Sequence, residues 1–119
     1  MNESILTSVK KLLTGLTEDD TAFDLDIIIH INSVFSILNQ LGVGSPGFTI
    51  QDKTSVWGDF LGSDEHLELI KSYTVLKVRQ MFDPPSTGPI VEAINKQLSE
   101  LEFRINVAAD PNENNVMEE

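Results

Sequence analysis

The sequence predicts an all-α protein, a small bundle of four helices. Three observations carry this prediction: apolar residues recur at helical spacing in four segments, glycines or a double proline end three of them, and the absence of cysteine rules out a fold held by disulfides. At 119 residues the chain suits a single domain. We expect this domain to span residues 1–109 and to be followed by an acidic, flexible tail over residues 110–119.

The first two helices are expected over residues 2–13 and 22–41. Lys10 and Lys11 suit the last turn of the first helix, because cations are favourable near a helix C-terminus. The second helix has a very wide apolar face, and its β-branched isoleucines alone would also suit a strand. The spacing of three and four residues, sustained until Gly42 ends the segment, favours a helix.

The segment over residues 42–62 is expected to be a long loop, because it is rich in glycine and its apolar groups are short. It could hold a short strand near residues 48–51 and one helical turn near residues 56–61. Trp57 is the expected anchor of this loop. Loops of this length are unusual in compact domains and tend to be functional.

The third helix, expected over residues 64–82, organises the rest of the chain. Ser63 suits its N-cap, and the acidic residues that follow suit the positive end of the helix dipole. Its stop motif consists of Phe82, Asp83, Pro84 and Pro85. The fourth helix is expected over residues 89–108, with Pro89 as its first residue.

Apolar residues also lie outside the main apolar face of three helices. These residues are Leu25, Ile29, Leu69, Tyr73, Leu76, Phe103 and Val107. With Trp57 they are candidates for contacts with other subunits, because a domain of this size is marginal on one core alone. On the residues alone, however, burial of the third helix between two others is the favoured explanation for the stripe that contains Tyr73.

The charged and ionisable residues predict no catalytic, cofactor or metal site. Acidic residues outnumber basic ones by 19 to 8, and the net charge of −11 argues against direct phosphate binding. His30 could hydrogen-bond Asp26, but a core histidine is the simpler interpretation. The start of the third helix explains Glu65 and Glu68 beside His66 without a metal, since ligand spacing is missing.

The sequence also predicts a soluble, intracellular protein without membrane contact. Near the N-terminus a glutamate comes early and the lysines follow apolar residues, which is the wrong order for a secretory signal. No segment approaches the roughly 18 uninterrupted apolar residues that a membrane span needs.

Four stretches resemble the head-tail connector proteins of long-tailed bacteriophages and prophages. They are FDLDIIIHINSVFSILNQLGVG, TSVWGDFLG, LIKSYTVLKVRQMFDPP and the helix ending in LSELEFRINV. The resemblance covers roughly Ile5 to Val107, and its most specific parts are Lys71 to Pro85 and the Trp57 loop.

This resemblance implies a small helical adaptor, without catalysis, that forms a ring of usually twelve copies beneath the portal protein. Such a ring extends the DNA channel and offers a docking surface to the next head-completion or tail protein. It implies a place at the head-tail junction of the virion, after assembly in the bacterial cytoplasm, and DNA that passes without specific binding. The resemblance also reverses the preference above, so that the surplus apolar residues become subunit or portal contacts.

Two alternatives from other classes stay open. One is a free acidic regulator that mimics DNA and binds a basic host protein, although its acids collect at helix starts and in the tail rather than in one array. The other, weaker one is a small enzyme with a pocket near His30 and Trp57. In the connector interpretation, residues 42–62 and the acidic tail are expected to become ordered on a partner.

Overall fold

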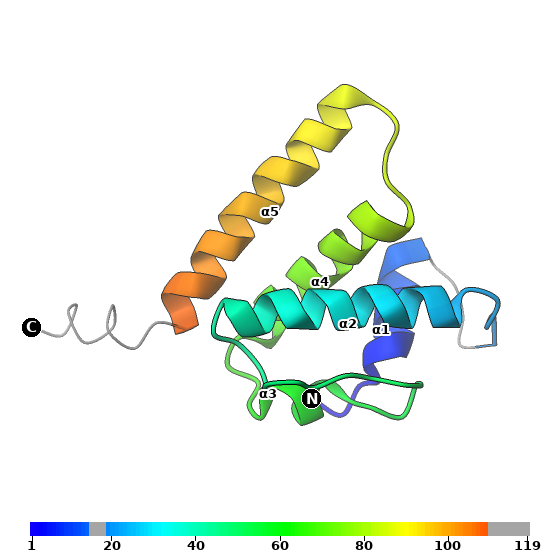
Figure 1. Ribbon diagram of the computed structural model, residues 1–119, viewed down its shortest axis with the longest axis vertical. Coiled ribbons are helices and arrows are strands. Elements are labelled where there is room, and N and C mark those ends of the chain that lie inside the picture. The colour runs from blue at the N-terminus through cyan, green and yellow to red at the C-terminus, as the bar shows by residue number, and fades with distance from the viewer. Residues whose placement is uncertain (15–18, 110–119) are drawn as a thin grey trace, which may run out of the picture.

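The computed structural model describes residues 1–14 and 19–109, and this part of the chain is helical with irregular connections (Figure 1). Its helices are α1 (Ile5–Thr14), α2 (Asp24–Gln40), α3 (Trp57–Leu61), α4 (Leu67–Phe82) and α5 (Gly88–Ala109). The all-α prediction is confirmed. Four helices match predicted ones, and the fifth, α3, forms where one helical turn was expected. The expectations for the tail, for residues 110–119, lie outside the described residues.

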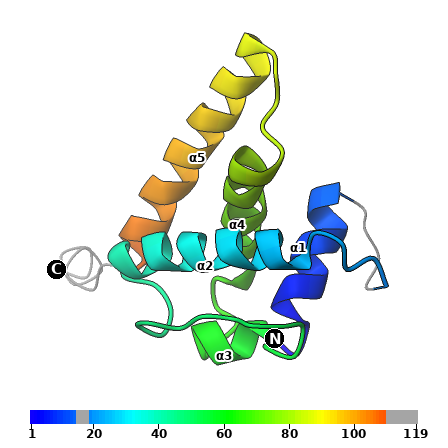
Figure 2. The same cartoon turned by 45° about the vertical axis from the view of Figure 1, so that its right-hand side comes forward.

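The central helix is α4, which contacts α1, α2 and α5 (Figures 1 and 2). Its buried residues Ile70, Tyr73, Thr74 and Val78 lie on more than one side of the helix, as its position between three neighbours requires. This packing agrees with the interpretation, from the residues alone, that the third helix is buried between others. No helix in the described part of the chain is long and apolar enough to cross a bilayer.

The start of α4 differs from the prediction, whereas its end agrees with it. Ser63 does not cap the helix: α4 begins at Leu67, and its N-cap His66 makes no side-chain capping bond. Gly62, at a left-handed φ of 77°, ends α3, and the residues after it form a turn in which the Leu67 N–H donates to the Asp64 carbonyl at 3.2 Å. The helix ends at Phe82, immediately before the Asp83 to Pro85 stop.

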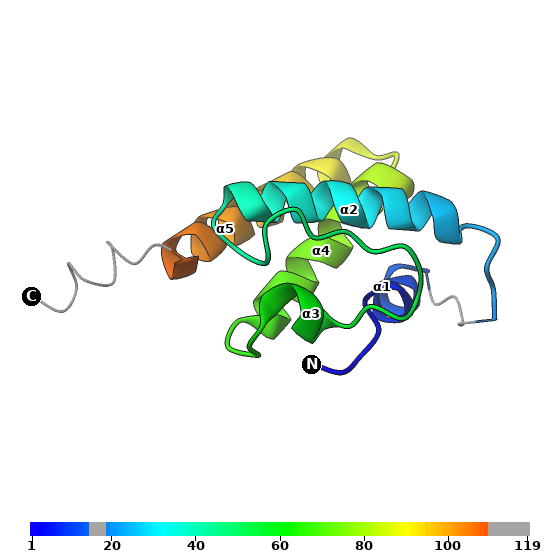
Figure 3. The same ribbon diagram turned by 60° about the horizontal axis from the view of Figure 1, so that its bottom comes forward.

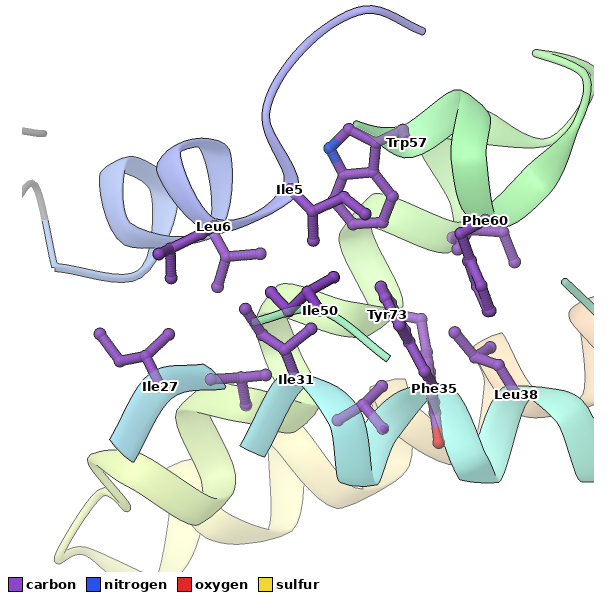
Figure 4. Close-up of a cluster of buried hydrophobic side chains, with 14 of the residues drawn as sticks. Ile5, Leu6, Ile27, Ile31, Phe35, Leu38, Ile50, Trp57, Phe60 and Tyr73 are labelled. Atoms are coloured by element: carbon purple, nitrogen blue, oxygen red, sulfur yellow. The ribbon is translucent and has the colours of Figure 1, made fainter. Parts of the chain in front are cut away.

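The core is centred between α2, α4 and the loop that follows α2 (Figure 4). Phe35 on α2 stacks on Phe60 of α3 with ring centroids 4.0 Å apart, and Trp57 meets Phe35 edge-on at 6.1 Å. Gly44 passes close to this stack at a φ of 83°, and a Cβ there would lie 2.2 Å from the Phe60 ring. Glycine is therefore required at Gly44 for both backbone and steric reasons.

Two asparagines on α2 fix the course of the loop. Asn32 donates through Nδ2 to the Ile50 carbonyl at 3.0 Å and accepts the Ile50 N–H through Oδ1 at 2.8 Å. Asn39 donates to the Val43 carbonyl at 2.9 Å and accepts from the Gly47 N–H at 3.3 Å. The short strand predicted near residues 48–51 is wrong, because an asparagine side chain takes the place of a partner strand.

The N-terminal residues also bind the loop, and this shortens the predicted first helix. The Ile5 N–H donates to the Ser55 carbonyl at 3.0 Å, and the Gly58 N–H donates to the Met1 carbonyl at 3.0 Å. Ser4 and Val56 form an isolated antiparallel bridge, so α1 begins at Ile5 rather than near Asn2. These bonds hold the loop within the single chain, contrary to the expectation that it needs a partner to become ordered.

A buried ion pair joins α1 to the start of α2. Lys10 is 2 % exposed, and its Nζ lies 2.8 Å from Asp24 Oδ1 and 2.6 Å from the Asp20 carbonyl oxygen. The sequence predicted only that Lys10 lies in the last turn of the first helix, where a cation is favourable. The ammonium group can be charged in this buried position because a carboxylate and a carbonyl oxygen accept its hydrogen bonds.

Candidate functional site

The residues predicted to contact other subunits fall into three groups: exposed, partly buried and fully buried. Exposed are Leu25 at 71 %, Ile29 at 54 %, Phe103 at 69 % and Val107 at 37 %. Leu69 and Leu76 are partly buried and pack against the core. Trp57 and Tyr73 are fully buried. Only the exposed group offers large apolar side chains to a partner.

One exposed patch lies near the start of α2. Leu25 and Ile29 are four residues apart and therefore lie one above the other on the helix surface. Ile27 and Ile31 occupy the opposite, buried side of the same turns. Phe23 adds to the exposed apolar surface at this end, and its ring meets Phe82 edge-on at 5.7 Å.

A second exposed patch lies near the end of α5. Phe103 and Val107 are again four residues apart, and Leu98 and Ile105 form the buried side of the helix. Because α5 packs mainly on α4, it leaves its outer side uncovered in the single chain (Figure 1). We name these surfaces the α2 patch (Leu25 and Ile29) and the α5 patch (Phe103 and Val107).

The two helix ends that carry the patches lie at opposite ends of the molecule. Figures 1, 2 and 3 all place the start of α2 at one side and the end of α5 at the other. A protein that binds copies of itself through two different surfaces forms rings or open filaments, according to the angle between them. The arrangement therefore suits a head-to-tail contact better than a symmetric dimer.

Trp57 and Tyr73 need a correction, because they serve the core of the single chain. The Trp57 indole N–H donates to Ser8 Oγ at 2.9 Å, and the Tyr73 hydroxyl donates to Glu102 Oε2 at 2.7 Å. Burial, followed by the hydrogen bond to Glu102 and the charge of that residue, raises the pKa of Tyr73 well above its usual value. Neither side chain presents surface to a partner.

Three further apolar residues, which follow the helical spacing of their segments, are exposed as well. They are Leu12 at 58 %, Phe23 at 48 % and Ile90 at 48 %. Leu12 lies in the last turn of α1, Phe23 is the N-cap residue before α2, and Ile90 lies in the first turn of α5. Position near a helix end was the available sequence signal.

The two histidines do not converge with other polar groups. His30 lies against the ring of Phe82 with centroids 6.2 Å apart, whereas Trp57, the first residue of α3, is buried in the core. His66 Nε2 lies 3.8 Å from Glu65 Oε1 at the surface. Among residues 1–14 and 19–109, no group of three or more histidine, aspartate or glutamate side chains is placed to hold a metal ion.

Comparison with known protein families agrees with the resemblance noted in the sequence. The family described as phage connector protein matches residues 5–112, which is nearly the whole chain. Comparisons with curated proteins and with solved structures gave no match. The match spans all five helices and both exposed patches. The chain therefore belongs to the phage connector protein family.

Proposed function

We propose that this protein is a head-tail connector that forms a ring beneath the portal protein. Family membership over residues 5–112 is the observation that carries the proposal. In this role it extends the DNA channel of the virion and gives the next head-completion or tail protein a docking surface. Assembly takes place in the bacterial cytoplasm, and the ring, of about twelve copies by analogy with the family, works without catalysis.

Contact between the α2 patch of one copy and the α5 patch of the next would close the ring. Both patches pair large apolar side chains at helical spacing, and such side chains contribute about 1.5–3 kcal/mol each when fully buried. The opposite placement of the patches supports a head-to-tail arrangement. Leu69 and Leu76 contribute less, because the core already covers them in part.

The charge of the chain supports a channel through which DNA moves. Each copy carries a net charge of −11, so a ring repeats this charge around its axis. Binding of DNA by proteins depends on cations that neutralise phosphates, and here acidic residues are in excess. The ring would thus let DNA pass through the channel without holding its phosphates through ion pairs.

The proposed contact is tested with two variants that each lose one patch. Variant L25S/I29S lacks the α2 patch, and variant F103S/V107S lacks the α5 patch. All four side chains are exposed, so both variants are expected to keep their free energy of unfolding within about 0.5 kcal/mol. Each alone should fail to form a ring with portal protein, as measured by native mass spectrometry and electron microscopy.

A mixture of the two variants distinguishes the geometries. In a head-to-tail contact, the intact α5 patch of L25S/I29S meets the intact α2 patch of F103S/V107S, and the mixture gives pairs but no rings. Variant I90S is the matched control, since Ile90 is an exposed apolar residue outside both patches. Rings of normal size from both variants would contradict the proposed contact, and failure of the unaltered chain to join portal protein would contradict the function.

A further inference from the structure

A hollow of about 550 Å³ lies between α1, α4 and α5 and belongs to neither exposed patch. Its apolar lining comprises Leu12, Val75, Leu76 and Leu101. Its charged lining comprises Glu68, Lys71, Arg79, Glu100 and Arg104. Since residues three and four apart on facing helices supply these side chains, the hollow is a groove that follows α4 and α5.

The groove gathers the two arginines of the chain, Arg79 and Arg104. Both are exposed, and neither forms a side-chain hydrogen bond or an ion pair with residues 1–14 or 19–109. Lys71, in contrast, pairs with Glu3 at 2.7 Å. In a chain with 19 acidic residues, two unpaired guanidinium groups beside an apolar floor indicate a site for a carboxylate-bearing segment.

We propose that residues 110–119 of the same chain bind in this groove. This segment contains four acidic residues and no basic ones, and it ends Val116-Met117-Glu118-Glu119. The valine and methionine match the apolar floor, and the glutamates match the two arginines in charge. The sequence alone predicts a flexible tail, and the groove is a surface of the same chain to which this tail can bind. The proposal does not depend on ring assembly.

The chain is long enough for this contact. Arg104 is five residues before Ala109, where α5 ends, and is therefore about 7.5 Å from that end along the helix. Residues 110–115 can span up to about 20 Å, which reaches the part of the groove between Arg104 and Gln97. Pro111 disfavours continuation of the helix. A short tether also raises the effective concentration of the segment to the millimolar range, so weak ion pairs suffice.

The contact is tested by nuclear magnetic resonance on the full ¹⁵N-labelled chain. The steady-state ¹H–¹⁵N nuclear Overhauser effects of residues 116–119 should approach those of the helices at low salt and fall at high salt, because salt screens the ion pairs. Variant R79E/R104E should lose this effect and give values typical of a free tail. Adding E118R/E119R to that variant should restore it, since the charges are then exchanged.

Two controls make the result specific. Variant K96E changes an exposed basic residue of α5 outside the groove and should leave the tail signals unchanged. A spin label on S99C, the sole cysteine in the variant, should broaden residues 116–119 of the same chain. Three outcomes would each overturn the proposal. The first is that residues 116–119 of the unaltered chain give the signals of a free segment, and the second is that charge exchange restores nothing. The third is that broadening occurs only when the label and ¹⁵N are on different copies.

Discussion

The loop between α2 and α4 and the helix α5 are held to the molecule in opposite ways. The loop has little regular structure, yet it contributes Ile50, Trp57 and Phe60 to the core, and side chains of α2 bind its backbone. Helix α5 is a regular helix of 22 residues, yet it packs mainly on α4. Regular backbone structure and firm attachment are therefore separate properties in this protein.

This difference relates to the work proposed for each region. The loop buries its largest side chains in the core of its own chain, so it fixes the relative positions of α1, α2 and α4. A helix attached on one side keeps an outer side that carries Phe103 and Val107. We infer that the irregular region preserves the fold and that the regular helix provides assembly surface.

The largest expected effect comes from variant W57A. Trp57 is fully buried and its indole N–H bonds Ser8, so truncation to alanine should lower the free energy of unfolding by about 3–5 kcal/mol. Variant F103A removes an aromatic ring that is 69 % exposed and should change it by less than about 0.5 kcal/mol. Urea unfolding followed by circular dichroism measures both, and similar values for the two variants would end the distinction between the regions.

Helical spacing and terminators predicted much of the fold. The apolar residues of α2 recur at a spacing of three and four residues, and the pair Pro84-Pro85 forces α4 to end. Both helices were therefore predicted from the sequence. The start of α4 was misplaced at Ser63 because an N-cap residue also suits the turn that the left-handed Gly62 begins. Local chemistry does not decide between these uses.

Burial of single residues was harder to predict, because it depends on which helices cross. Tyr73 belongs to a second apolar stripe, and periodicity could not say whether α5 or another subunit covers that stripe. Asn32 and Asn39 of α2 bind the backbone of the loop, and a helical pattern of apolar and polar residues contains no signal for such bonds. The exposed candidates Leu25, Ile29, Phe103 and Val107 were found because each departs from the main apolar face of its helix.

A middle-sized effect is expected from variant N32A, which tests how the loop is held. The substitution removes both bonds to Ile50 and leaves a backbone N–H and a carbonyl beside the core without their partners. The unfolding free energy should fall by about 1–3 kcal/mol, and amide hydrogen exchange at Ile50 should accelerate. Variant S36A, at an exposed position of the same helix, is the control. Unaltered exchange at Ile50 in N32A would mean that packing alone holds the loop.

The smallest effect is expected from variant Y73F, which tests a polar link between α4 and α5. The ring stays in the core, and only the hydroxyl that donates to Glu102 is lost. Since Glu102 is partly exposed and water can replace this donor, the unfolding free energy should fall by only about 0.5–1.5 kcal/mol near neutral pH.

The same hydroxyl predicts a pH dependence whose sign follows from the raised pKa of Tyr73. Below pH 10.0, the usual pKa of tyrosine, folded and unfolded chains both keep the proton, so stability does not depend on this group. Above that pH the unfolded chain releases the proton while the folded chain retains it, so the unfolding free energy falls, by at most about 1.4 kcal/mol per pH unit. Tyr73 is the one tyrosine of the sequence, so ultraviolet absorbance of tyrosinate follows it directly. If Tyr73 of the folded chain ionised near its usual pKa, water would reach the contact between α4 and α5. Helix α5 would then be attached to α4 less firmly than its packing indicates.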